Sequence, residues 1–572
     1  MLRSRGLRYG IFKNMLEREV ASRQPSSRAQ TEGSPVASNR EEKRKKKREK
    51  FRLKSLVLPL VVFLMAAGAR VIYLFLFTDF QSVAMDWYGD VYHHWQIAYL
   101  SKEIGFKKGF LRLWDLKGME YYWGLLHPLI LILGFAVSGS YSILVAKIIS
   151  IFFGSLAVCL IYLICSRYFN KKTGFFAALF VSFMPVAVFA DTLGMQAQIG
   201  LFCLLLGVYF WQTSPFLTGI FWMLAGMVRA EYWLFGAGLT LAAVLRGKNF
   251  DKRIQVLAGY GIVLLFYAKY MLDHTGNAIY PIYYNFVATV AGEWFDKTIS
   301  VPDKVWLIKS VCQGLAIFFF VMGLLVLWRR FKGWLLFLTG LSNLTFIFFV
   351  FGFGYYLYGY PDDPFFHIID KLWVDRLMAW PYSFLGVVLA VLLFYSLPKL
   401  GKRIGQIGLI GQIGQTGINL LALVVFAAVL AVTQLIWPSI NYHYTKAMVP
   451  LEDKKEAALL TAENYQNKGT IFVPEGMPDF TYFLVAKGKI PGKVLVSQMY
   501  DPFFYYEGEG DPYNKWGDFR EKIIEWLEKH NAELFIVPTG VNRYRKMLQF
   551  EEGKLFERVA GSKGMEVWRV SL

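Results

Sequence analysis

The sequence predicts an all-α polytopic membrane domain of about eleven spans, followed by a small extracytoplasmic α/β domain at the C-terminus. Three observations predict this fold class. Of the 572 residues, 55% are hydrophobic and only 18% are charged, which is too little charge for a soluble protein of this size. Apolar runs of span length alternate with short basic loops. After residue 438 the pattern changes to short strands that alternate with helices.

The N-terminal segment, residues 1–54, is polar and basic and includes the charge run from Glu41 to Arg48. Such a run predicts a disordered cytoplasmic tail that favours anionic lipid. The net charge of +20 does not indicate nucleic-acid binding, because the basic residues gather before the first span and in loops between spans. This is the distribution that the positive-inside rule requires.

The membrane domain is expected over residues 55–438. The predicted spans are 55–78, 142–167, 174–190, 195–212, 216–229, 231–246, 254–272, 306–328, 333–352, 377–397 and 417–438. With the N-terminus inside, the loops on the inner side are the basic ones, as at Arg246, Lys248 and Lys252. Counting the apolar stretch 125–137 as a full span would reverse this order, so we expect a partial or re-entrant helix there, within a large first external loop, 79–141.

The tail, residues 439–572, reads as a small α/β domain on the outer face. The segments 470–473 and 533–537 predict buried strands, and 518–530 predicts an amphipathic helix. All four cysteines lie in or beside apolar runs of the membrane domain, so neither a disulfide framework nor a metal-type cysteine spacing is indicated.

Unusual polar residues converge at the outer ends of the spans in this topology. They are Asp86, Asp90, His93, His94, Asp191, Gln196, Arg229, Glu231, Asp375 and Arg376. A transporter would place its ionisable groups near mid-span, often in two repeated halves. We see no internal repeat, and the pattern favours an enzyme that works at the outer interface.

Asp90 is the first candidate for a general base, since chemistry at a hydroxyl acceptor needs a fixed carboxylate to take its proton. The alternative is an N-cap of the helix 91–100. Asp86, with Asp90 and a histidine, would suit a divalent cation, although a solvated loop carboxylate fits it as well. His93 and His94 diverge by about 100° on a helix, so one of them can contact substrate while the other packs.

Asp191 sits between two spans and either orients the acceptor or carrier head group or caps a helix. Arg376 opens the tenth span from outside. A guanidinium at that level suits a phosphate through two parallel hydrogen bonds, and would stabilise the charge that grows on a departing phosphate. The alternative is an interfacial arginine paired with Asp375. Arg229 and Glu231 fit either a substrate site or a local ion pair.

At this point the sequence resembles the GT-C membrane glycosyltransferases, most closely the protein mannosyltransferase and aminoarabinose transferase branch. The motifs that carry the resemblance are Gly89-Asp90-x-Tyr92-His93-His94-Trp95, Leu126-His127-Pro128-Leu129, Met227-Val-Arg229-Ala-Glu231 and the segment from Arg376 to Pro381. Their order spans roughly residues 55–400. A distant likeness to oligosaccharyltransferase catalytic subunits accompanies them.

The resemblance implies a transferase that moves a sugar from a polyprenyl- or dolichyl-phosphate carrier to a protein, lipid or glycan acceptor at the outer face, with inversion. Asp90 then matches the family's base, Asp191 a second acidic position, and Arg376 an arginine that opens a late span. Gln196 stands where a glutamate is expected. We expect a multi-pass protein of a prokaryotic cell membrane. The basic N-terminal segment predicts that the N-terminus lies in the cytoplasm, with the C-terminal domain outside.

Three alternatives remain open. A metal-dependent enzyme of the oligosaccharyltransferase type would bind Mg²⁺ or Mn²⁺ through Asp86 and Asp90, although the acceptor motif Trp-Trp-Asp-Tyr-Gly of that group is absent from the tail. Otherwise no cofactor is expected. A transporter or flippase of lipid-linked saccharide would move the lipid without changing the sugar. A degenerate relative would use its tail domain as an interaction module.

Overall fold

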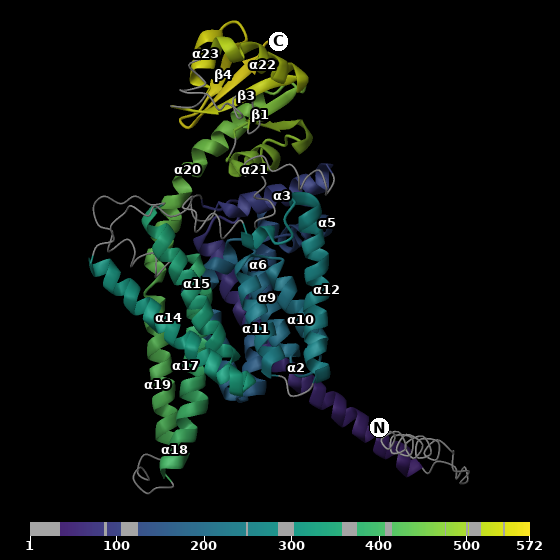
Figure 1. The fold of residues 1–572 in the computed structure, drawn as a ribbon, viewed down its shortest axis with the longest axis vertical. Coiled ribbons are helices and arrows are strands. Elements are labelled where there is room, and N and C mark those ends of the chain that lie inside the picture. The colour runs from purple at the N-terminus through teal and green to yellow at the C-terminus, as the bar shows by residue number, and fades with distance from the viewer. Residues whose placement is uncertain are drawn as a thin grey trace, which may run out of the picture. The chain divides into compact units, whose positions relative to one another are not determined.

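The computed structural model describes residues 35–84, 89–104, 124–246, 250–283, 303–356, 375–405, 415–474, 476–498, 502, 516–540 and 544–572. Asp86 and much of the predicted external loops therefore lie outside the described residues. Two compact units are present, Met1–Leu58 and Pro59–Leu572. All elements from α3 onward belong to the second unit (Figure 1).

The first part of the chain forms helices where the apolar runs predict them. These are α2 (Pro35–Phe77), α3 (Asp90–Ile104), α5 (Leu126–Ser138) and α6 (Ile143–Tyr168). Helix α2 starts at Pro35, so part of the basic segment expected to be disordered is helical, consistent with the helix propensity of Lys, Arg and Glu. Helix α5 has 13 residues, fewer than the roughly 20 that cross a bilayer. That length fits the expected partial helix.

The middle of the chain continues with short helices. They are α7 (Lys171–Phe183), α8 (Pro185–Thr192), α9 (Ala197–Phe210), α10 (Pro215–Gly226), α11 (Glu231–Arg246) and α12 (Phe250–Thr275). The predicted span 174–190 is bent by 61° between α7 and α8. Pro185 stands at the first turn of α8, where its missing N–H costs nothing, whereas it would break a continuous helix.

The later part of the membrane domain is also mostly helical. They are α14 (Asp303–Arg329), η3 (Phe331–Gly333), α15 (Trp334–Tyr356), η4 (Arg376–Met378), α17 (Ala379–Val391), the π-helical η5 (Leu392–Ser396), α18 (Leu397–Gly405), α19 (Gln415–Gln434) and α20 (Trp437–Asn464). Helix α20 crosses the predicted domain boundary at residue 439. It leads from the membrane helices into the C-terminal sheet (Figure 1).

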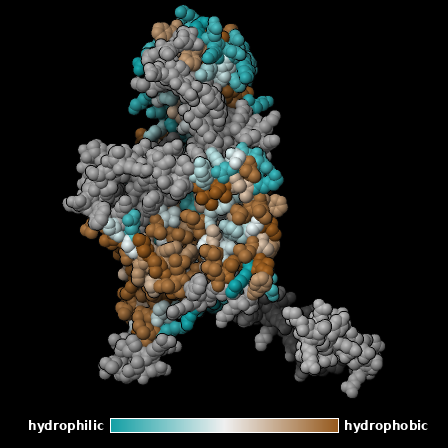
Figure 2. Space-filling view, in the orientation of Figure 1, coloured by the Kyte–Doolittle hydropathy of each residue, from teal (hydrophilic) through white to brown (hydrophobic). Residues whose placement is uncertain are grey.

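The chain is a mostly helical protein with the apolar character of an integral membrane protein. Within the described residues, six helices are long and apolar enough to cross a membrane, or seven if the bent pair α7–α8 is one span. Helices α9 and α10, with 14 and 12 residues, are too short for that test. The predicted number of about eleven spans is thus not confirmed. Figure 2 shows hydrophobic residues over the helices on the visible face, and hydrophilic ones over the C-terminal part.

The C-terminal part holds a five-stranded sheet of order β2-β1-β3-β5-β4. Its elements are β1 (Thr470–Val473), α21 (Pro478–Ala486), η6 (Gly492–Val494), β2 (Leu495–Ser497), α22 (Trp516–Lys529), β3 (Ala532–Pro538), α23 (Arg545–Glu551), β4 (Phe556–Gly561) and β5 (Met565–Val570). Strand β1 pairs in parallel with β2 and β3, and β5 is antiparallel to β3 and β4. The two strands and the helix expected here are confirmed.

Helix α21 packs against α3, the helix that Asp90 begins. The Tyr482 hydroxyl on α21 donates to the Gln81 carbonyl at 3.0 Å and accepts from the Ile143 N–H at 3.2 Å. Its ring meets the Trp95 ring of α3 edge to face, with centroids 5.0 Å apart. Nearby, the Gly492 N–H donates to the Tyr99 hydroxyl at 2.9 Å. These contacts attach the start of the C-terminal domain to α3 and to the residues around Gln81 and Ile143.

Candidate active site

The centre of the site is an ion pair between Asp90 and Arg376. Asp90 is the first residue of α3, and Arg376 is the first residue of η4. Arg376 Nη2 donates to Asp90 Oδ2 at 2.6 Å. The Asp375 carboxylate accepts from the Leu377 N–H at 2.8 Å, so Asp375 caps η4 and Asp90, rather than Asp375, is the ionic partner of Arg376. The structure thus joins two predicted site residues that lie far apart in the sequence.

The charges around Asp90 hold it ionised. Burial raises the pKa of its carboxyl, but the charge and hydrogen bond of Arg376, with the charges of His93 and Arg229, bring the pKa below its usual value. Burial also places the pKa of His94 well below the usual value, and His127, Arg229, His93 and Arg376 lower it further. At neutral pH the site therefore presents a carboxylate beside a neutral imidazole.

A second ion pair lies on the other side of the site. Glu231 begins α11, where a carboxylate is favoured by the helix dipole. Arg229 Nε donates to Glu231 Oε2 at 3.1 Å, and Arg229 Nη2 lies 2.7 Å from Glu231 Oε1. The local pair expected from the sequence is therefore present, and its guanidinium also acts electrostatically on Asp90.

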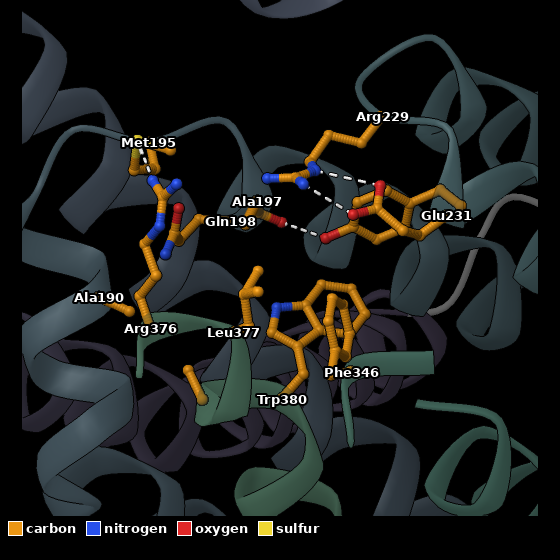
Figure 3. Close-up of a pocket in the computed structure, with 12 residues that line it drawn as sticks. Ala190, Met195, Ala197, Gln198, Arg229, Glu231, Phe346, Arg376, Leu377 and Trp380 are labelled. Atoms are coloured by element: carbon orange, nitrogen blue, oxygen red, sulfur yellow. Dashed lines mark hydrogen bonds and ion pairs between the residues drawn. The ribbon is translucent and has the colours of Figure 1, made fainter. Parts of the chain in front are cut away.

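Both arginines line one cavity, whose empty space of about 460 Å³ includes its opening to solvent (Figure 3). Its walls come from α8, α9, α11, α15, η4 and α17, and from the connections before α9 and α11. The lining residues are Ala190, Met195, Ala197, Gln198, Arg229, Glu231, Tyr232, Phe346, Arg376, Leu377, Ala379 and Trp380. Three of the predicted site residues line this cavity, namely Arg376, Arg229 and Glu231. Asp90 does not line it, but it is paired with Arg376, which does. The cavity is apolar towards Trp380 and Phe346 and charged towards the arginines.

Asp191 is buried beside this cavity rather than lining it. Arg70 Nε on α2 donates to Asp191 Oδ2 at 2.5 Å, and the Arg70 side chain is 1% exposed. Arg70 Nη1 also donates to the Ala66 carbonyl at 3.0 Å. Gly154 makes room for the pair, since a Cβ there would lie 2.1 Å from Asp191 Oδ2. Asp191 thus has a fixed cationic partner that the sequence analysis did not foresee.

The remaining predicted residues lie around the ion pairs. His93 and His94 are in the first turns of α3, His93 half-buried and His94 buried, and the His94 ring meets the His127 ring of α5 with centroids 4.7 Å apart. Gln196 precedes α9 and is fully buried. Neither of its amide atoms has a hydrogen-bond partner among the described residues. None of these three residues lines the cavity.

Two buried cationic side chains were not predicted from the sequence. Arg70 lies inside the first apolar run and Lys147 inside the second. Lys147 Nζ donates to the Asp79 carbonyl at 2.6 Å and to the Ser82 carbonyl at 2.8 Å, which fixes the segment that leaves α2. A lone basic residue in a span is a signal by itself, since it needs a partner inside the protein. The sequence could have marked both residues, although not their partners.

The described residues do not fit a metal ion. They contain no group of three or more His, Cys, Asp or Glu side chains placed to hold one. Asp86, the second expected ligand, lies outside them. Asp90 faces Arg376, and a guanidinium at 2.6 Å competes directly with a cation for the same carboxylate.

Comparisons with known proteins find likeness in structure only. No family model matches the chain, and no curated protein does. The similar solved structures include the following two. ArnT from Cupriavidus metallidurans bound to undecaprenyl phosphate has 13% identity and a TM-score of 0.47, over 91% of this chain and 98% of that one. The oligosaccharyltransferase AglB from Archaeoglobus fulgidus, with an inhibitory peptide and a dolichol-phosphate, has 15% identity and a TM-score of 0.45, over 84% and 69%.

Both proteins are of the groups that the sequence analysis named as similar. At such identities and TM-scores the likeness assigns no role to any residue of this chain. Each role is argued from the contacts of the residue itself.

Proposed function

We propose that this protein is a membrane glycosyltransferase that moves a sugar from a polyprenyl- or dolichyl-phosphate carrier to an acceptor at the outer membrane face. The observation that carries the proposal is the Asp90–Arg376 ion pair beside a cavity that a second arginine, Arg229, also lines. A carboxylate next to two guanidinium groups offers both a proton acceptor and a phosphate site, at the ends of apolar helices where a lipid carrier can approach.

Arg376 is the proposed phosphate ligand. Its Nη1 lies 2.9 Å from the Met195 sulfur, and a thioether is a weak acceptor that a phosphate oxygen can readily replace. Arginine binds phosphate through two parallel hydrogen bonds. As the sugar leaves the carrier, negative charge grows on the phosphate, and a guanidinium fixed there stabilises the transition state. Arg229 lines the same cavity, and its positive charge adds to this stabilisation.

Asp90 is the proposed general base. The acceptor hydroxyl attacks the anomeric carbon, the bond from that carbon to the phosphate oxygen breaks, and the carrier phosphate leaves with the electron pair. Asp90 takes the proton of the hydroxyl, and attack from the side opposite the phosphate inverts the anomeric centre. When Arg376 turns towards the phosphate, Asp90 loses its main ionic partner. Burial then raises the pKa of Asp90 and makes the carboxylate a stronger base.

The other predicted residues take supporting roles in this proposal. His93 and His94 border Asp90 on α3 and would contact the acceptor or its sugar. Glu231 orients Arg229, and Asp191 acts through its neighbours rather than on the substrate. Gln196 stays a proposed binding residue. A metal is not part of the proposal. We propose that the N-terminus lies in the cytoplasm and the C-terminal domain outside.

The test is transfer of labelled sugar by the purified protein in nanodiscs, from undecaprenyl- and dolichyl-phosphate sugars, with and without chelator and beside Asp90→Asn. Turnover that is lost in Asp90→Asn and indifferent to chelator supports the proposal. Turnover lost with chelator favours a metal-dependent enzyme of the oligosaccharyltransferase type instead. Intact lipid-linked sugar that crosses the bilayer of reconstituted vesicles, with no transfer, favours a transporter and contradicts the proposal.

A further inference from the structure

Gln198 is a buried residue of the cavity wall with an uncommitted hydrogen-bond acceptor. It lies in the first turn of α9 and is 3% exposed. Its Oε1 has no hydrogen-bond partner among the described residues. In the view of Figure 3 its amide lies on the Arg376 side of the cavity. A buried amide oxygen without a partner is unfavourable, so a site that keeps one gains from a ligand that donates to it.

The orientation of this amide follows from Asp191. The Gln198 side chain is close enough to the Asp191 carboxylate to stabilise its ionised form. A carboxylate only accepts, so the amide nitrogen of Gln198 faces Asp191 and its oxygen faces away. Arg70 holds Asp191 in turn at 2.5 Å. A buried ion pair that begins on α2 therefore fixes the orientation of the Gln198 amide.

The chemistry of the cavity then limits what Gln198 can bind. Glu231 is the carboxylate on the cavity wall, and both of its oxygens already contact the Arg229 guanidinium. A cationic amino group would therefore find its natural carboxylate partner occupied. Gln198 offers a neutral acceptor, which suits a hydroxyl. The apolar wall at Trp380 and Phe346 suits the face of a sugar ring.

We propose that Gln198 Oε1 accepts a hydrogen bond from one hydroxyl of the donor sugar, and that the cavity thereby selects a neutral hexosyl phosphate donor. Gln198 is a binding residue in this proposal, and Asp191 and Arg70 are positioning residues that act through it. The inference rests on the proposed function, because the ligand is the sugar of the lipid-phosphate donor. Movement of Arg376 from Met195 onto the phosphate opens the wall beside Gln198 for that hydroxyl.

The experiment measures binding, and needs no acceptor. The full-length protein in nanodiscs is titrated with undecaprenyl phosphate and with undecaprenyl-phosphate glucose, mannose and galactose. The Kd of the bare carrier divided by the Kd of the best sugar ester gives the sugar preference. Gln198→Leu is expected to lower this preference about tenfold and to leave the Kd of the bare carrier unchanged. Asp191→Asn should lower the same ratio, again without weakening the bare carrier.

The matched control is Gln434→Leu. The Gln434 amide donates to the Phe183 carbonyl at 3.0 Å and does not line the cavity, so its loss should leave the sugar preference unchanged. A preference that is the same in Gln198→Leu as in the unaltered protein overturns the inference while the proposed function stands. Equal affinity of the bare carrier and all three sugar esters overturns it too. Absence of binding by undecaprenyl phosphate itself would instead count against the proposed function.

Discussion

Replacing Asp90 with asparagine removes the proposed base and keeps the shape of the side chain. The carboxamide cannot take the proton of the acceptor, and loss of a general base lowers kcat by about 10²- to 10⁴-fold. The effect on folding should be small. The ion pair with Arg376 is 2.6 Å long but only partly buried, with side chains 32% and 14% exposed, so it is screened by solvent. An asparagine oxygen can still accept from Arg376, and we expect a loss of about 1 kcal/mol of stability.

The assay is single-turnover transfer from a polyprenyl-phosphate donor, beside thermal unfolding of each variant in the same detergent. The matched control is Asp273→Asn, because Asp273 also pairs with a cation, Lys269, at 3.0 Å, but with both side chains well exposed on α12. It should keep its activity and lose less than about 0.5 kcal/mol.

A transfer rate of Asp90→Asn within about threefold of the rate of the unaltered protein would refute the assignment, because loss of a general base lowers the rate far more than that. So would equal losses in Asp90→Asn and Asp273→Asn. A large loss of activity with an unchanged unfolding temperature is the expected result.

Two further predictions concern the ion pairs. In Arg376→Gln the pKa of Asp90 should rise, because the charge and hydrogen bond of Arg376 no longer offset the effect of burial. The base works only when it is deprotonated, so the acid limb of the kcat/KM profile should move to higher pH. An acid limb at the same pH as in the unaltered protein would contradict the Asp90–Arg376 pairing. Gly154→Ala should displace Asp191, whose Oδ2 lies 2.1 Å from the added Cβ, and cost about 2–5 kcal/mol in detergent unfolding. Gly68→Ala, with open space around the Cβ, should cost nothing, and equal costs would contradict this account.

The sequence was sufficient to place the helices. Each of the predicted spans coincides with helix, because a run of apolar residues both favours helix and excludes polar loops. It could not decide which helices cross the bilayer, since α9 and α10 are too short alone and their surroundings determine whether they do. The bend before Pro185 was visible in principle, because proline cannot continue the hydrogen-bond ladder of α7.

For the site, residue types were easier to predict than partners. Asp90 and Arg376 were both expected at the outer face, but not as partners of each other. The alternative partner of Arg376 was Asp375, which caps η4 in the structure. Arg70 was missed although a charge in an apolar run is conspicuous. Its partner Asp191 is 121 positions away in sequence, and only the packing of α2 against α8 reveals the pair. The orientation of Gln198 depends on the same packing.

The contact between α21 and α3 has a consequence for how this protein can be divided. Tyr482 bonds the Gln81 carbonyl and the Ile143 N–H, and its ring packs on Trp95 of the helix that begins at Asp90. A cut near residue 439 would therefore expose aromatic surface on both fragments and leave α3 without one of its walls. The last quarter of the chain is better regarded as part of the structural frame around α3 than as an exchangeable module. Swapping it with that of a relative would require the α3 surface to be exchanged with it.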